Sequence, residues 1–406
     1  MKRLSFKSQI IQHLFCRGQS SCAELSEKLD KSLPFVNGLL AELVDAQYVF
    51  EKGLAGSTGG RRPITYSITD NLLYIVAVSM DQLYTHIAII DMHRNIVGQV
   101  SQFEIPLKDN AMALPKLTEC ISDIIKHCGI EKNKLIGVGI GMPGFINIRN
   151  GTNYTFINFE EINIPEYIHT QTGLPVVIDN DSSVIALAEL KFGAAAGSSN
   201  TMVININWGV GLGMVVKGEL YRGEKGFAGE FSHIPLFNNN KLCSCGKSGC
   251  LETEASMLVI VEKAIAGVKS GRITGLSDIT SGDYDVASRE IMAAAGRGDQ
   301  FSIELLSEVG YHIGRGVAIL VHLFNPAIIV LSGRGAAAGK IWKAPIQQAL
   351  NEHCIPRLVE GTVIEVSAIG SHAGILGAAA LVMENLQMPG IQKKMFPDIE
   401  KTLSLS

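Results

Sequence analysis

Two kinds of structure are predicted in this chain: a small helical head that ends in a hairpin, and a larger α/β body behind it. Three segments with helical spacing of apolar residues open the sequence, and two strand-like runs joined by a glycine-rich segment follow them. From Leu72 onward, short apolar runs alternate with helical stretches, which is the pattern of an α/β domain. The 406 residues are enough for two or three domains, and the 47% of hydrophobic residues can fill their cores.

The first 46 residues predict three helices. Apolar residues recur at helical spacing between residues 6 and 16. Ser21, followed three positions later by Glu24, is a capping box that starts a second helix. Ser32 can cap a third helix that has Pro34 in its first turn. Two short helices joined by a three-residue turn are typical of a helix-turn-helix, whose second helix enters the major groove of DNA.

A hairpin is predicted directly after these helices. The glycine-rich residues 53–63 join two strand-like runs at 48–51 and 65–68, and they carry Arg61 and Arg62. Arginines on such an arm suit contact with phosphates or with a narrow minor groove. The alternative is a solvated linker with two ordinary surface charges. The position after the helices favours the wing of a winged helix.

Charge is unevenly distributed along the chain. Residues 1–66 hold nine Lys or Arg and six Asp or Glu, a net charge of +3, so the rest carries −7 of the total of −4. A basic end on an acidic body suits contact with DNA. The chain shows no secretory signal and no apolar run of membrane-spanning length, so we expect a cytoplasmic protein without a membrane partner. Its eight cysteines are then expected to be reduced thiols or metal ligands.

The body is expected to contain at least six strands. A late strand followed by glycine, at residues 327–333, repeats the earlier pattern and suggests two similar α/β halves. The expected strands lie at residues 74–78, 86–90, 135–140, 175–178, 201–206 and 327–331.

Four potential metal ligands lie near one another in the sequence: His233, Cys243, Cys245 and Cys250. Three thiolates and one imidazole make a complete tetrahedral set for Zn²⁺ and leave no position for a catalytic water. A chance cluster of buried cysteines is the alternative, and it is disfavoured because three of the eight cysteines fall within eight residues. We therefore predict a structural zinc site.

These ligands lie within a longer pattern that resembles a known family. Ala228-Gly-Glu-Phe-Ser-His233, followed by Cys243-x-Cys-Gly-x-x-Gly-Cys-Leu-Glu252, resembles the signature of the ROK family of repressors and sugar kinases. The resemblance extends from about residue 72 to 385, and Gly-Gly-Arg-Arg-Pro at 59–63 resembles the link after the winged helix of family repressors that respond to xylose or N-acetylglucosamine. Ser232 stands where the family usually has glycine.

The resemblance implies a fold and domain boundaries. The body is expected to adopt the actin-like, two-lobed sugar-kinase fold of the α/β class, behind a winged helix-turn-helix. The expected domains are the winged helix-turn-helix at 1–70, lobe 1 at 71–195, and lobe 2 with the zinc loop at 196–406. A return of the C-terminal helix to lobe 1 is left open.

The resemblance also implies a sugar pocket. Asn180-Asp181 resembles the family's sugar-binding pair, whose aspartate is the general base in the kinases. The zinc loop would fix Glu230 and Glu252 so that both carboxylates accept hydrogen bonds from sugar hydroxyls. Any one of these residues alone could be a surface carboxylate or a capping asparagine, but together they match the family. The residues expected in the pocket are Gly144, Asn180, Asp181, Glu230, His233 and Glu252.

Two turns that bind phosphate in the family's kinases differ here. The kinases have Asp-x-Gly-Gly-Thr where this chain has residues 81–85, Asp-Gln-Leu-Tyr-Thr, and Gly-Thr-Gly where it has residues 207–209, Asn-Trp-Gly. Glycine lets the backbone approach phosphate closely, and bulky side chains oppose this approach. We expect ATP binding and kinase activity to be lost, with Asp181 left as a vestigial general base. The alternative is that the loops move and ATP still binds. A glycine pattern at 209–213 also resembles a nucleotide turn, but such patterns are common.

These observations predict a sugar-responsive DNA-binding transcriptional regulator, a repressor of carbohydrate-utilisation genes that is not an enzyme. The expected partners are a double-stranded DNA operator, a sugar or sugar phosphate, and further copies of the chain in a homodimer or homotetramer. Two alternatives stay open: an active ATP-dependent sugar kinase, and a repressor controlled by a protein partner. The side chains expected at DNA are Lys31, Ser32, Phe35 and Asn37 near the start of the third helix, with Arg61 and Arg62 on the wing.

Overall fold

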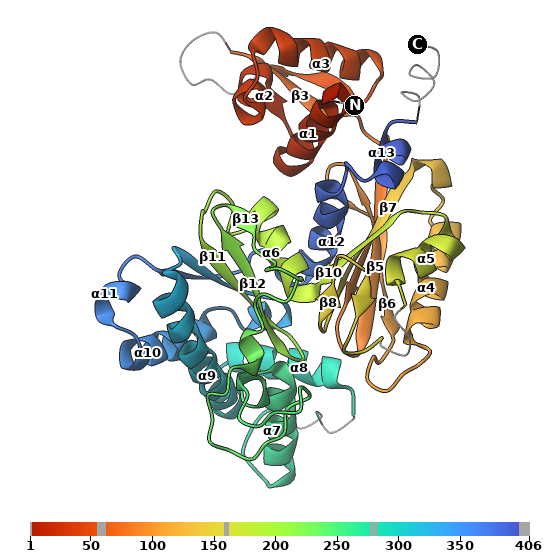
Figure 1. Cartoon of the computed structure of the whole chain (residues 1–406). Helices are drawn as coiled ribbons and strands as arrows, with labels where there is room; N and C mark the ends of the chain where they lie inside the picture. Colours follow the sequence, from red (N-terminus) through yellow and green to blue (C-terminus); the bar gives the residue numbers. More distant parts are fainter. Residues whose placement is uncertain (1, 55–61, 158–161, 277–278, 280–281, 398–406) are drawn as a thin grey trace. The chain divides into compact units, whose positions relative to one another are not determined.

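The computed structural model of the chain describes residues 2–54, 62–157, 162–276, 279 and 282–397 (Figure 1). The chain divides into two compact units. Unit 1 comprises residues 1–142, 150–179 and 378–406, and unit 2 comprises residues 143–149 and 180–377.

Unit 1 begins with three helices and a small antiparallel sheet. The three helices and the two hairpin strands that we expected for the head are among these elements. The sheet has the order β1-β3-β2. The predicted capping box is present, because the Ser21 side chain accepts a hydrogen bond from Glu24 N while Ser21 N donates to Glu24 Oε2 over 2.7 Å. Ser32 occupies the N-cap position of the third helix, but its side chain makes no capping hydrogen bond. The elements are α1 (Lys2–Arg17), β1 (Ser20–Ser21), α2 (Cys22–Leu29), α3 (Leu33–Asp45), β2 (Val49–Leu54) and β3 (Ile64–Ile68).

The turn between α2 and α3 follows from local chemistry. Asp30 adopts the left-handed conformation, with φ 51°, and ends α2. An aspartate tolerates this region better than most residues. The next helix then presents one apolar face to the head's core, since its four buried side chains recur at helical spacing. These are Val36, Leu39, Leu40 and Leu43.

The rest of unit 1 is built on a five-stranded sheet with the order β10-β7-β4-β5-β6. The central strand β4 is nearly all buried and pairs parallel with β7 and antiparallel with β5. Helices α4 and α5 lie together along one face of this sheet (Figure 1). The strands of the sheet are β4 (Tyr74–Met80), β5 (Tyr84–Asp91), β6 (Ile96–Glu104), β7 (Leu135–Met142) and β10 (Val176–Asn180), and the short β9 (Thr152–Asn153) lies outside it. The helices are α4 (Ala113–His127), η1 (Lys132–Lys134), α5 (Ile164–Thr172) and α13 (Pro389–Met395).

Unit 2 is built on a second five-stranded sheet, with the order β13-β12-β11-β14-β15. Its strands are β11 (Thr201–Ile206), β12 (Val210–Val216), β13 (Glu219–Leu220), β14 (Ile328–Ser332) and β15 (Val363–Val366), with the short β8 (Ile146–Asn147) outside the sheet. The long helices are α6 (Asp181–Phe192), α7 (Met257–Lys269), α8 (Tyr284–Gly296), α9 (Gln300–Phe324) and α10 (Lys343–His353). Shorter ones are η2 (Phe231–His233), η3 (Leu251–Thr253), η4 (Arg334–Trp342), α11 (Pro356–Val359) and η5 (Gly370–His372), and α12 (Ala373–Glu384) continues from unit 2 into unit 1.

The two sheets repeat one topology. In each, the first strand is flanked by the second and the fourth, the third lies outside the second, and the fifth lies outside the fourth. In each, the first strand is antiparallel to the second and parallel to the fourth. The prediction of two similar α/β halves is therefore confirmed.

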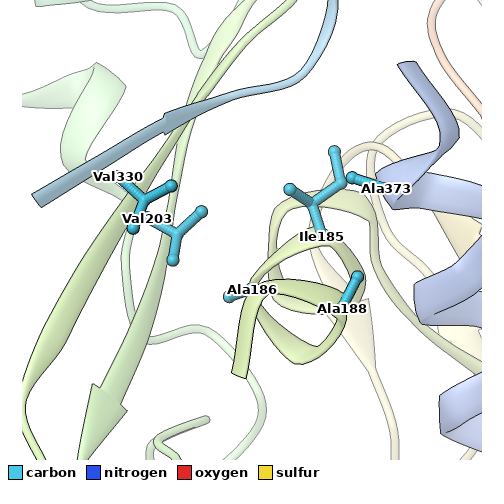
Figure 2. Close-up of a cluster of buried hydrophobic side chains, with 6 residues drawn as sticks. All are labelled: Ile185, Ala186, Ala188, Val203, Val330 and Ala373. Atoms are coloured by element: carbon cyan, nitrogen blue, oxygen red, sulfur yellow. The ribbon is translucent and has the colours of Figure 1, made fainter. Parts of the chain in front are cut away.

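Helix α6 packs against the sheet of unit 2 through small side chains. Figure 2 shows Ala186 of α6 facing Val203 and Val330 of the sheet, and Ile185 beside Ala373 of α12. The approach is close because β12 carries glycines: a Cβ at Gly213 would lie 2.2 Å from Ala186 Cβ. Gly211 and Gly213 of the pattern at 209–213 therefore lie in strand β12, where they make room for α6, and do not form a turn.

Among the residues that the structure describes, no helix is long and apolar enough to cross a membrane.

Candidate functional site

The four predicted metal ligands converge in unit 2. The ligand atoms of His233, Cys243, Cys245 and Cys250 all lie within 4.8 Å of one another. Cys245 Sγ and Cys250 Sγ are 3.6 Å apart, and His233 Nδ1 is 3.5 Å from Cys243 Sγ. A tetrahedral zinc with Zn–S bonds of about 2.3 Å sets its sulfur ligands roughly 3.8 Å apart. The donor set therefore fits Zn²⁺ in both chemistry and spacing.

The surroundings of Cys250 disfavour its thiolate form. Burial, together with the adjacent Cys245 and Cys243, raises the pKa of Cys250 to about 12. A bound metal ion favours the thiolate forms, because ligand thiols must lose their protons to coordinate it. Zn²⁺ at this position would stabilise the loop and leave no coordination site for a substrate.

The metal loop is a tight turn that the backbone enforces. Cys243 N donates to Lys247 O over 2.8 Å, and Gly246 N donates to Cys243 O over 2.9 Å. Gly246 and Gly249 both have positive φ, and a Cβ at Gly249 would lie 2.1 Å from Phe237 O. Glycine is required there, because any other residue would force the loop off its neighbour.

His233 connects the metal group to an acidic group. While its Nδ1 faces Cys243, its Nε2 lies 3.7 Å from Glu230 Oε2. Glu252 lies on the other side of the loop, with Oε2 3.6 Å from Cys243 Sγ. Both carboxylates therefore lie beside the four candidate metal ligands.

The electrostatics of Glu230 place three carboxylates in one site. Burial, together with the negative charges of Asp181 and Glu252, raises the pKa of Glu230 to about 7. Carboxylate oxygens accept hydrogen bonds from hydroxyl donors. Such a group can bind a polyhydroxylated ligand through several hydrogen bonds at once.

Asn180 and Gly144 join this site through the start of α6. Asn180 is the N-cap of α6, since its Oδ1 accepts from Ser182 N and Ser183 N, and its Nδ2 donates to Gly144 O over 3.1 Å. Gly144 has φ 98°, which favours glycine. The structure thus brings all six residues of the predicted pocket into unit 2.

Phe145 and Asn205 were not predicted from the sequence. The Phe145 ring stacks on His233 with centroids 6.0 Å apart, and it contacts Phe227 edge-on at 5.9 Å. Its position directly after Gly144 was the one available signal. Asn205 donates to Asp181 Oδ2 over 3.1 Å, and nothing in the local sequence points to that contact.

In unit 1, the side chain of Asp81 accepts hydrogen bonds from backbone N–H groups of the turn at residues 81–85. Asp81 Oδ1 accepts from Leu83 N over 2.8 Å and from Tyr84 N over 2.7 Å. Two N–H groups of this turn therefore already have an anionic partner within the chain.

In unit 2, the turn at Asn207–Gly209 is filled by side chains. The Trp208 ring is 2% exposed, lies under the guanidinium of Arg334 at 4.7 Å, and contacts Tyr284 edge-on. Asn207 Oδ1 accepts from Trp208 N over 3.0 Å and from Arg334 Nε over 3.3 Å. Asp285 forms an ion pair with the same guanidinium.

The side chains predicted at DNA differ in their surroundings. Lys31, Ser32, Asn37 and Arg62 are exposed, whereas Phe35 is partly buried, with its ring edge-on to Phe6 at 5.4 Å. The Lys31 ammonium lies 5.4 Å from the Phe6 ring centroid. Arg61 lies outside the residues that the structure describes.

Comparisons with known proteins identify a matching family model, similar sequences and a similar solved structure. A model of the ROK family matches residues 75–385. The chain is 28% identical over 375 residues to a xylose repressor of Caldicellulosiruptor bescii, covering 90% of this chain and 92% of that protein. It is 33% identical over 297 residues to a glucokinase of Halalkalibacterium halodurans, covering 70% of this chain and 88% of the glucokinase. A solved ROK family transcriptional regulator, a homologue of E. coli MLC, shares the fold with a TM-score of 0.76 at 24% identity, over 97% of this chain and 98% of that one.

Proposed function

The chain belongs to the ROK family, and from that membership we propose that it is a sugar-responsive, DNA-binding transcriptional repressor whose kinase-like body binds a sugar without phosphorylating it. The match to a xylose repressor over 90% of this chain supports this proposal, because that relative is covered nearly end to end. Homologues that share only the kinase portion would leave the first 70 residues without a counterpart.

The buried position of Trp208 carries the proposal that phosphoryl transfer is lost. Phosphate binding at a turn requires free backbone N–H groups and room for the anion. Here the indole fills the turn beneath Arg334, and Asn207 Oδ1 accepts the hydrogen bond of Trp208 N. The turn at Asp81 is likewise occupied by its own carboxylate. Both turns would have to rearrange before they could bind the phosphates of ATP.

The acidic group of unit 2 supports sugar binding. Asp181, Glu230 and Glu252 supply acceptors, Asn180 supplies an amide, and the aromatic Phe145 lies beside His233. A small number of charged and polar groups beside an aromatic ring is typical of sites that bind small molecules. We propose that Gly144, Asn180, Asp181, Glu230, His233 and Glu252 contact the sugar, and that Zn²⁺ on His233, Cys243, Cys245 and Cys250 is structural.

The head is proposed to be a winged helix-turn-helix that binds operator DNA. The consecutive helices α2 and α3 and the three-stranded sheet of the head support this proposal. The exposed Lys31, Ser32 and Asn37 would lie near the major groove of the DNA, and Arg62 would lie near its phosphate backbone. Phe35 is better suited to hold α3 against α1, because its ring packs on Phe6.

Binding of the sugar is proposed to change the affinity for DNA by favouring one of two conformations. A ligand shifts such an equilibrium only by the ratio of its affinities for the two states. A homodimer or homotetramer would then present two heads to a two-fold operator.

The test is DNA capture with and without sugars. The protein is mixed with sheared genomic DNA of its source, bound fragments are sequenced, and the affinity of the enriched fragment is measured by fluorescence anisotropy. We expect one or a few fragments to bind tightly and a sugar to change that affinity. Tight binding that no carbohydrate alters would contradict the sensing part of the proposal, and no selective fragment would contradict DNA recognition.

An active sugar kinase is the second candidate, because the glucokinase relative is 33% identical over most of its length. A coupled assay of ADP release with hexoses and pentoses decides between the two. Turnover that disappears in Asp181→Asn would establish the kinase, since that aspartate is the general-base position.

A further inference from the structure

We propose that Asn205 is a positioning residue for sugar recognition: it holds the Asp181 carboxylate as a fixed hydrogen-bond acceptor for a hydroxyl of the bound sugar. This inference rests on the proposed function and assigns a role to a residue outside the predicted pocket. It is carried by the contacts of the Asn205 side chain, which lies on β11, the central strand of unit 2.

The amide of Asn205 is directed at Asp181 and its neighbour. Its Nδ2 donates to Asp181 Oδ2 over 3.1 Å and to Ser182 Oγ over 3.1 Å. Ser182 Oγ in turn lies 3.3 Å from Asp181 Oδ1. Both oxygens of the carboxylate are thus oriented by a donor from the protein.

The orientation of the amide is determined by charge. If the amide were turned around, its oxygen would face the carboxylate, and two acceptors would oppose each other. In the orientation observed, Asn205 Oδ1 is buried and has no hydrogen-bond partner within the described part of the chain. Leaving a buried amide oxygen unpaired is costly, and the two hydrogen bonds that Nδ2 donates to Asp181 and Ser182 offset this cost.

Two glycines leave the space that this arrangement needs. A Cβ at Gly333 would lie 2.3 Å from Asn205 Oδ1, and Gly333 has φ 77°. A Cβ at Gly211 would lie 2.0 Å from Ser182 Oγ. Larger residues at either position would displace the amide or the hydroxyl, so the packing of β12 and of the turn after β14 holds the pair in place.

The experiment measures sugar affinity by calorimetry for the wild type and for Asn205→Ala, Asp181→Ala and the double variant, with D-xylose, D-glucose and N-acetyl-D-glucosamine as probes. We expect Asn205→Ala to raise the Kd of the sugar that binds by about tenfold, the usual effect of one hydrogen bond to a charged group. Once Asp181→Ala has removed the carboxylate, Asn205→Ala should have no further effect on the Kd. Asn351→Ala, on the exposed surface of α10, is the matched control and should leave the Kd unchanged.

Asn205→Asp keeps the size of the side chain and guards against a cavity effect. It places two carboxylates against each other at neutral pH, so its Kd should exceed that of the wild type. The ratio of the Kd of Asn205→Asp to the Kd of the wild type should fall as pH is lowered from about 7 to about 5. At the lower pH the two carboxylates share a proton, which restores a hydrogen-bond donor to Asp181.

Each outcome decides a different claim. Suppose that the wild type binds a probe sugar. The role of Asn205 alone is then overturned if Asn205→Ala binds that sugar with the same Kd. It is also overturned if the increases in Kd caused by the two single substitutions multiply in the double variant. If no probe binds the wild type, the proposed sugar sensing fails together with this inference.

Discussion

The guanidinium of Arg334 lies 4.7 Å above the ring of Trp208, and an ion pair with Asp285 holds it there. The ring is 2% exposed and its Nε1 has no hydrogen-bond partner within the described residues. Trp208 comes from the turn between β11 and β12, whereas Arg334 follows β14. Side chains from distant parts of the sequence thus fill a turn that binds phosphate in the kinases that the chain resembles.

Replacing Trp208 with Ala should lower the free energy of unfolding by about 3–5 kcal/mol, because a large buried side chain is removed and its cavity stays. Urea unfolding of the variant and the wild type measures this difference. Trp208→Phe keeps a ring beneath Arg334 and should lose less. An unchanged urea midpoint for Trp208→Ala would contradict the packing described here.

Removing the metal should destabilise unit 2. We expect one zinc per chain by elemental analysis, lost in Cys243→Ser and after treatment with a chelator, with a fall in melting temperature of several degrees. Cys354→Ser is the matched control, because Cys354 is also buried but lies outside the four-ligand cluster. Full zinc content in Cys243→Ser would rule out the proposed ligand set.

The N-cap of α9 should contribute to stability in a pH-dependent way. Burial alone would raise the pKa of Asp299, but hydrogen bonds from Gly275, Ser302 and Thr274 lower it from 3.8 to about 2. Because the folded-state pKa is the lower one, the contribution is present above about pH 4 and is lost as pH falls toward about 2. Asp299→Ala should cost about 0.5–2 kcal/mol at neutral pH. Its difference from the wild type should shrink in acid, as followed by urea unfolding at a series of pH values. A constant difference would contradict this pKa.

Loss of Glu230 should separate sugar response from DNA binding. Glu230→Gln keeps the size of the side chain but removes an acceptor charge beside Asp181 and Glu252. We expect operator affinity within about twofold of the wild type, since the head is untouched, and loss of the effect of sugar on that affinity. Anisotropy titrations with and without sugar measure both, and an unaltered sugar response would remove Glu230 from the pocket.

Arg62 and Asn37 should affect DNA binding in different ways. Arg62→Ala should weaken binding to all sequences alike and reduce the salt slope by about 1, whereas Asn37→Ala should relax the preference at one base pair. The exposed Arg357, in unit 2, is the matched control. The readout is affinity against salt concentration for the operator and its single-base variants. A base-specific effect of Arg62→Ala would show that it contacts bases.

Features set by local chemistry were predictable from the sequence. The capping box at Ser21 and the metal ligands depend on residues a few positions apart, and both are present as expected. Strand β6 was missed because none of its residues is buried, residues 97–99 are all exposed, and it lies at the edge of its sheet. The contact of Asn205 with Asp181 spans 24 residues, and that of Arg334 with Asn207 spans 127, so neither is visible before the strands are placed.

The most direct test of sugar sensing without phosphorylation is a thermal-shift screen of the wild type with monosaccharides, amino sugars, their 6-phosphates and Mg-ATP. A ligand that binds only the folded state raises the melting temperature. We predict a rise with one class of sugar and none with Mg-ATP, because Trp208 and Asp81 fill the two turns at which we propose that phosphate binding is lost. A strong rise with Mg-ATP would contradict this account and make the sugar kinase the better interpretation.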